Sequence, residues 1–158
     1  MKEEQIKDFT RRISQCNKGE MIVIIYDILF AYMEDAKESY AVHNYEGFKL
    51  ALKKAEKAVD ELIKALSFRY DIAKDLYSLY VFAKESMAKA VIKNRLKEVE
   101  DARRVLYQLY EAFVEAAKQD HSEPLMKNTQ QVYAGMTYGK NNLTETFQEL
   151  ETSRGFFA

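Results

Sequence analysis

The residues of this chain that could carry out chemistry are few and widely separated. Histidine is the usual proton shuttle and a common metal ligand, but His43 and His121 lie far apart in the sequence. Neither has the Glu-x-x-His spacing with which helical bundles hold a metal pair. The lone Cys16 has no evident histidine partner, and an isolated cysteine is usually a small buried apolar residue. No glycine-rich phosphate loop is present. We therefore expect no enzyme, no catalytic residue, no metal site and no cofactor.

The charge balance argues against nucleic acid and membrane partners. The chain carries 24 Lys and Arg against 25 Asp and Glu, so no strong field favours DNA or an acidic bilayer. The basic residues between Lys93 and Arg104 are interspersed with acidic ones, as on a solvated helix face. No apolar run approaches the ~20 residues of a membrane span, and the charged start does not resemble a signal peptide. A single cysteine suits a reducing compartment. These features predict a cytoplasmic protein without nucleic-acid binding or membrane insertion.

The elements that must position any binding residues are helices. Five glycines, one proline and 31% charged residues in 158 positions are typical of an all-α protein. Apolar spacing predicts a short helix over 3–15, then helices over about 18–42, from after Tyr45 to about 66, about 72–93 and about 95–119. Asn17 with Glu20 forms a capping-box pattern, and Asp71 is a second predicted cap. On the helix after Asp71, one face carries the predicted core residues Ile72, Leu76, Leu79, Tyr80, Ala83 and Met87.

Short connections favour antiparallel neighbours. We therefore predict an antiparallel up-down four-helix bundle with a short N-terminal helix or arm. Residues 1–120 would form the bundle domain, and residues 121–158 an irregular C-terminal tail, partly disordered or docked. The tail contains Pro124 and one predicted short helix over about 143–151, capped by Asn142. It is too apolar for a free linker, so it either docks on the second apolar stripe of the helix over 18–42, described below, as an internal competitor for a partner, or is itself a docking peptide for another partner.

The helix over 18–42 has more apolar surface than one buried face requires. Its stretch Met21–Met33 contains a single charge, Asp27. On a helical wheel the glutamates of this helix fall within about 20° of Asp27, which marks a solvated side. The predicted core stripe lies opposite and comprises Ile22, Ile25, Leu29, Tyr32, Met33 and Ala36. A second apolar stripe flanks Asp27 within about 60° and comprises Val23, Ile24, Phe30 and Ala31.

Other helices carry weaker second lines. Leu96, Tyr107 and Val114 lie off the core face of the last helix, and Tyr77 and Val81 lie off the core face of the helix before it. One interpretation is an elongated apolar groove that receives an amphipathic segment of a partner. The other is that the helix over 18–42 is central and its extra stripe is covered by the arm and tail. The two are compatible, because a covering arm can yield to a partner.

Several of these residues together resemble a known family. Ile13, the cap Asn17 and the run Ile25-Tyr26-Asp27 are similar to the opening of the FliS family of flagellar secretion chaperones. The segment Asp71–Tyr80 resembles the signature of the family's third helix, and Asn94 fits its last turn. The resemblance extends over about residues 9–118. The chain departs from the family pattern in having Lys18-Gly19-Glu20 after the cap and Phe9 without a tyrosine in the arm.

The resemblance implies a cytoplasmic bacterial chaperone that binds the C-terminal segment of flagellin. Such a protein prevents premature polymerisation and aids delivery to the export gate, as a monomer or weak dimer. Tyr26 and Asp27 are carried over as partner-binding residues with the matched motif. The expected groove residues are Val23, Ile24, Phe30, Tyr77, Val81, Leu96, Tyr107 and Val114. The alternative is a self-associating structural bundle, or an adaptor for another partner helix.

Overall fold

The computed structural model describes residues 1–127 and folds them into five helices. These are α1 (Glu3–Gln15), α2 (Lys18–Ala41), α3 (Tyr45–Lys64), α4 (Ile72–Lys93) and α5 (Lys97–Lys118). No strand occurs in this part of the chain, so the all-α prediction is confirmed, with helix limits close to those expected. The predicted short helix over 143–151 lies outside the described residues, as does most of the predicted tail.

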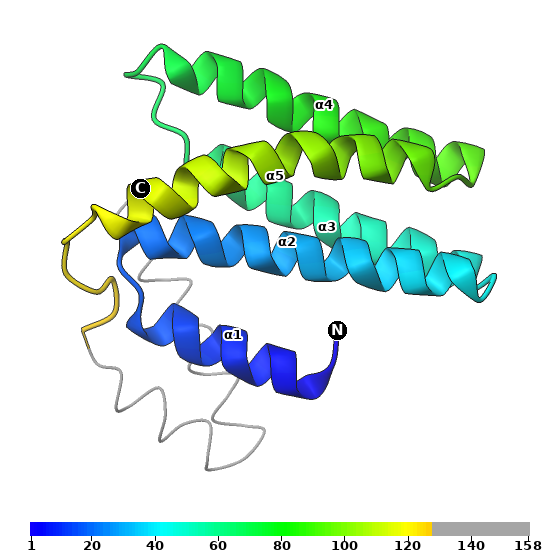
Figure 1. Cartoon of the computed structure of the whole chain (residues 1–158), viewed down its shortest axis with the longest axis horizontal. Helices are drawn as coiled ribbons and strands as arrows, with labels where there is room; N and C mark the ends of the chain where they lie inside the picture. Colours follow the sequence, from blue (N-terminus) through cyan, green and yellow to red (C-terminus); the bar gives the residue numbers. More distant parts are fainter. Residues whose placement is uncertain (128–158) are drawn as a thin grey trace.

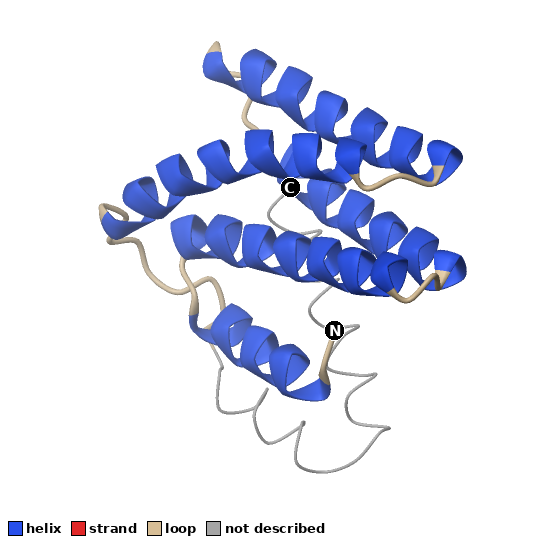
Figure 2. Cartoon of the chain, turned by 45° about the vertical axis from the view of Figure 1, so that its right-hand side comes forward, coloured by secondary structure: helices blue, strands red, loops and turns tan. Residues whose placement is uncertain are grey.

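The helix α2 lies at the centre of the arrangement. It contacts α1, α3 and α5, while α4 contacts α3 and α5 (Figure 1). The four long helices therefore contact one another in a closed ring, α2–α3–α4–α5. Within residues 1–127, α1 contacts α2 alone among the helices and lies outside this ring (Figure 2). None of the five helices combines the length and apolar character needed to cross a bilayer.

Local polar contacts fix the helix ends. The Asn17 side chain accepts a hydrogen bond from the Glu20 amide at 2.9 Å, and Glu20 accepts one from the Asn17 amide at 2.9 Å. This confirms the predicted capping box. Asn94 ends α4 in the left-handed conformation, with φ of 51°. The prediction for Asp71 is wrong in one respect: it holds the N-cap position of α4, but its side chain makes no capping hydrogen bond.

The start of α2 is tied to the end of α5. The Asn17 side-chain amide donates to the Asp120 carbonyl at 3.0 Å, and the Gly19 amide donates to the Asp120 carboxylate at 2.8 Å. A β-carbon at Gly19 would lie 2.8 Å from that carboxylate oxygen. Position 19 therefore needs glycine, because any side chain would push the end of α5 away from α2.

Most of the apolar faces predicted for the helices are buried in the core. The buried face of α2 differs in part from the predicted one. On α2 the buried residues are Ile24, Tyr26, Leu29, Met33 and Ala36, whereas Ile22, Ile25 and Tyr32 only pack against the edge of the core. Leu29, Met33 and Ala36 of the predicted stripe are therefore buried as expected, and Ile24 and Tyr26 join them because α2 has helices on three sides. Ile72 is a second correction: it was expected in the core of α4 and is 64% exposed.

Candidate functional site

The structure brings the second apolar stripes of α2 and α5 together along the line where these two helices meet. We call this line the α2–α5 seam and define it by Val23 and Phe30 on α2 and Leu96, Tyr107 and Val114 on α5. The rings of Phe30 and Tyr107 lie 5.9 Å apart at its middle. Val23 and Val114 line one pocket at one end, and Leu96 lines a smaller hollow with Met33 at the other. Five of the ten predicted residues therefore share one surface.

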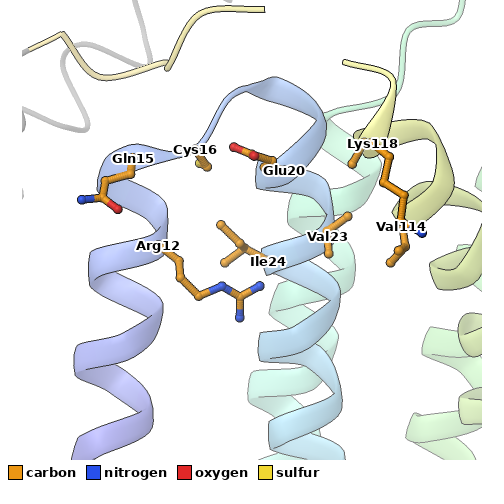
Figure 3. A pocket seen from close by; sticks show the side chains of 9 residues that line it. Arg12, Gln15, Cys16, Glu20, Val23, Ile24, Val114 and Lys118 are labelled. Atoms are coloured by element: carbon orange, nitrogen blue, oxygen red, sulfur yellow. The ribbon is translucent and has the colours of Figure 1, made fainter. Parts of the chain in front are cut away.

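The widest opening on the seam lies where α1 ends and α2 begins. This pocket has a volume of about 510 Å³ and draws its walls from α1, α2 and α5 (Figure 3). Val23 and Val114 project into it from facing helices, while Glu20 and Lys118 stand at its edge (Figure 3). An apolar floor with charged edges suits an apolar side chain of a partner whose flanking residues are polar.

An aromatic cluster forms the middle of the seam. Phe30 and Tyr110 meet edge to face at 5.5 Å, and Tyr107 lies 5.8 Å from Tyr110. The Arg103 guanidinium lies 5.4 Å from the Phe30 ring centre. Phe30 is half-buried, whereas Tyr107 is 46% exposed. Tyr107 is therefore the large seam side chain that a partner can reach without any movement of the helices.

The helix α1 covers the α2 face beside the seam. Ile24 is 3% exposed, and it faces α1 while Arg12 reaches toward α2 (Figure 3). The Arg12 guanidinium donates to the Asp27 carboxylate at 2.5 Å. At Ile24, this coverage fits the interpretation in which α2 is a central helix whose second apolar stripe is covered by the arm. Around Tyr107, by contrast, the surface stays exposed.

Asp27 is the polar junction of three helices. It accepts from Arg12 of α1, and it lies close enough to Tyr110 of α5 to affect that phenol electrostatically. Burial raises the pKa of Tyr110, and the neighbouring Asp27 carboxylate raises it further. Asp27 therefore links α2 to α1 and lies beside α5. The helical wheel had instead predicted that Asp27 stands on a solvated face.

The remaining predicted residues lie elsewhere. Tyr26 is fully buried in the core, so a partner cannot touch it in this conformation. Tyr77 lies on α4 with its ring 6.1 Å from that of Phe68. Val81 is half-buried on the same helix, and α4 reaches α2 through the buried Tyr80 and Tyr26 side chains rather than along the seam. These two residues are therefore outside the seam.

Two residues that lie beside the seam, Tyr110 and Arg103, were not predicted from the sequence. Tyr110 follows Tyr107 by three positions, and this spacing puts both rings on neighbouring parts of one helix face. Arg103 had been read as part of a mixed charge run, and nothing in the sequence indicates that it covers Phe30. Within residues 1–127, no group of three or more His, Cys, Asp and Glu side chains could hold a metal ion.

The comparison with protein families places these features in context. The model of the family described as "Flagellar protein FliS" matches residues 2–120. The matched range includes all five helices and the whole seam. No curated protein matches the chain.

Proposed function

The chain belongs to the FliS family of flagellar export chaperones, and from this premise we propose that its α2–α5 seam binds the C-terminal segment of flagellin. In this proposal residues 1–120 form an antiparallel up-down four-helix bundle with α1 as an arm. The protein acts in the bacterial cytosol, keeps flagellin from polymerising early and delivers it to the export gate.

The observation that carries the proposal is the apolar line of the seam, which the ion pair of Arg103 with Glu34 crosses beyond Phe30 at 3.5 Å. Its two ends are hollowed, and its middle presents the exposed ring of Tyr107 between them. An amphipathic helix placed along such a line would insert apolar residues at intervals of three or four. Covering a few hundred Å² of apolar surface contributes several kcal/mol at about 25 cal/mol/Å².

The position of α1 suggests how the seam and the arm work together. Arg12 and Asp27 form a partly exposed ion pair, and such pairs contribute at most about 1 kcal/mol. A client that gains several kcal/mol of apolar burial can therefore displace α1 from Ile24 and lengthen the apolar surface that it occupies.

Isothermal titration with a synthetic peptide of the last ~40 residues of a flagellin from the source organism tests the proposal. We expect one-to-one binding with a negative heat-capacity change, because apolar surface becomes buried. Absence of binding, together with a stable dimer in light scattering, would instead favour the self-associating bundle.

A further inference from the structure

A second apolar opening lies at the end of the bundle, away from the seam's aromatic cluster. It has a volume of about 360 Å³, and we call it the end hollow. Its walls come from the start of α2, the end of α3, the start of α4 and the end of α5, and α1 contributes nothing to it. The residues that define it here are Ile22, Leu62, Leu66, Ile72, Leu76 and Phe113.

The mouth of the end hollow exposes large apolar side chains. Ile72 and Tyr70 line the hollow and are 64% and 68% exposed. Phe68, in the same connection between α3 and α4, is also exposed. Ile72 has the spacing of a core residue on α4 but no covering neighbour, and a cluster of this kind on a soluble domain marks a docking surface.

The chain itself supplies a segment of matching chemistry. Residues 142–151 place Leu143, Phe147 and Leu150 at positions i, i+4 and i+7, which is one face of a helix. Asn142 with Glu145 has the pattern of a capping box. Glu145, Glu149 and Glu151 make the segment acidic.

Basic residues lie at the same end of the bundle as the end hollow and could pair with the acidic side chains of this segment. Lys18 lines the end hollow. Arg69 lies between the exposed Phe68 and Tyr70, and Lys74 stands exposed in the first turn of α4. Asp120 also lines the hollow, and Asp71 and Asp75 stand exposed beside Lys74. The match therefore rests on the apolar face of the segment, and the basic residues offer individual partners to its glutamates.

The path of the chain brings this segment within reach. Asp120 lines the end hollow, and the Leu125 amide donates to the Cys16 carbonyl at 3.0 Å, which keeps the chain near the start of α2. Asn142 follows Asp120 by 22 positions. Even a chain of random-coil dimensions spans roughly 25 Å over that length, and tethering raises the local concentration of the segment to about the millimolar range.

We propose that the end hollow is an intramolecular docking site for residues 142–151, seated as a helix with Phe147 in the hollow. The docked segment covers Ile72 and the α3–α4 connection. It occupies a surface distinct from the α2–α5 seam, so the inference does not depend on the identity of the client.

Photo-crosslinking in the full-length protein tests the proposal. Phe147 is replaced by p-benzoylphenylalanine, the protein is irradiated at low concentration, and the crosslinked peptides are identified by mass spectrometry. We expect crosslinks within one chain to residues 65–76, to Phe113 or to Ala116, which line the end hollow or its mouth and do not belong to the seam. Moving the probe to Gln148, on the other side of the predicted helix, should remove most of them.

A matched pair of variants makes the test specific. Ile72→Asp should reduce the crosslink yield roughly tenfold, because a charge at the mouth opposes apolar burial. Ile92→Asp, at a site near the other end of α4 that is 83% exposed against 64% for Ile72, should leave the yield unchanged. Crosslinks to the seam, crosslinks only between chains, no crosslinks, or equal yields in both variants would each overturn the proposal.

Discussion

The hydroxyl oxygens of Tyr26 and Tyr80 lie 2.8 Å apart in the buried centre of the protein. This hydrogen bond joins α2 to α4, two helices that are not neighbours in the ring of contacts. Both tyrosines belong to the segments through which the chain resembles its family. The signature tyrosine of α2 therefore acts on the fold, and the client surface that we propose lies on the seam beside it.

Removing either hydroxyl should destabilise the protein. Tyr26→Phe or Tyr80→Phe leaves the other buried phenol without its partner, so each variant should lose about 1 kcal/mol of unfolding free energy in urea denaturation. The double variant should lose less than the sum of the two. Tyr70→Phe, at an exposed site, is the control and should match the parent. Single variants as stable as the parent would show that the bond contributes nothing.

The same pair predicts a loss of stability in alkali. Burial raises the pKa of Tyr26 and Tyr80 above the ordinary value of 10.0. The folded protein therefore keeps protons that the unfolded chain releases above that pH. The stabilisation that comes from these two raised pKa values is fully present below about pH 10, and it is lost as the pH rises further. The unfolding free energy should decrease as the pH rises above about 10, and less steeply in the Tyr26→Phe/Tyr80→Phe variant. Parallel slopes would contradict this origin.

The ion pair between α1 and α2 predicts how firmly the arm is held. Arg12→Ala removes the contact with Asp27, so hydrogen exchange of the amides in residues 3–15 should become faster while the other helices keep their protection. Arg11→Ala is the matched control, because Arg11 pairs with Asp8 within α1 itself. Equal effects of the two variants would mean that the pair does not hold the arm.

The two asparagine caps, Asn17 and Asn44, should differ in how much each contributes to the unfolding free energy. Asn17 is buried, caps α2 and also donates to Asp120, whereas Asn44 caps α3 from an exposed position. Asn44→Ala should cost about 1 kcal/mol, as ordinary caps do. Asn17→Ala should cost more, because the Asp120 carbonyl also loses its partner. Thermal or urea unfolding measures both, and a smaller loss at Asn17 would contradict the link between α2 and α5.

Much of the fold could be predicted because helix signals are local. The Asn17 cap, the glycine-poor composition and the regular spacing of Phe48, Leu52 and Val59 indicate where helices begin and which face they bury. The second stripes of α2 and α5 were also visible, because each is a property of one helix. The sequence alone therefore predicted five of the residues that line the seam.

The features of the fold and of the candidate site that could not be predicted depend on contacts between segments that are distant in the sequence. A wheel assigned Asp27 to solvent, yet Arg12 and Tyr110 surround it. Ile24 was predicted to line an open groove, but it is 3% exposed beneath α1, so a charge there would perturb the fold as well as binding. Tyr26 and Tyr80 are 54 positions apart, and nothing in either local pattern indicates their bond.

The most direct test of the seam compares two exposed aromatic residues in titrations with the flagellin C-terminal peptide. Tyr107 on the seam is 46% exposed, and Phe82 on α4 is 43% exposed and outside it. Tyr107→Asp should weaken binding by about tenfold or more, whereas Phe82→Asp should bind like the parent, with both variants fully helical by circular dichroism. Unchanged binding by Tyr107→Asp, or an equal loss in Phe82→Asp, would contradict the assignment of the client to the α2–α5 seam.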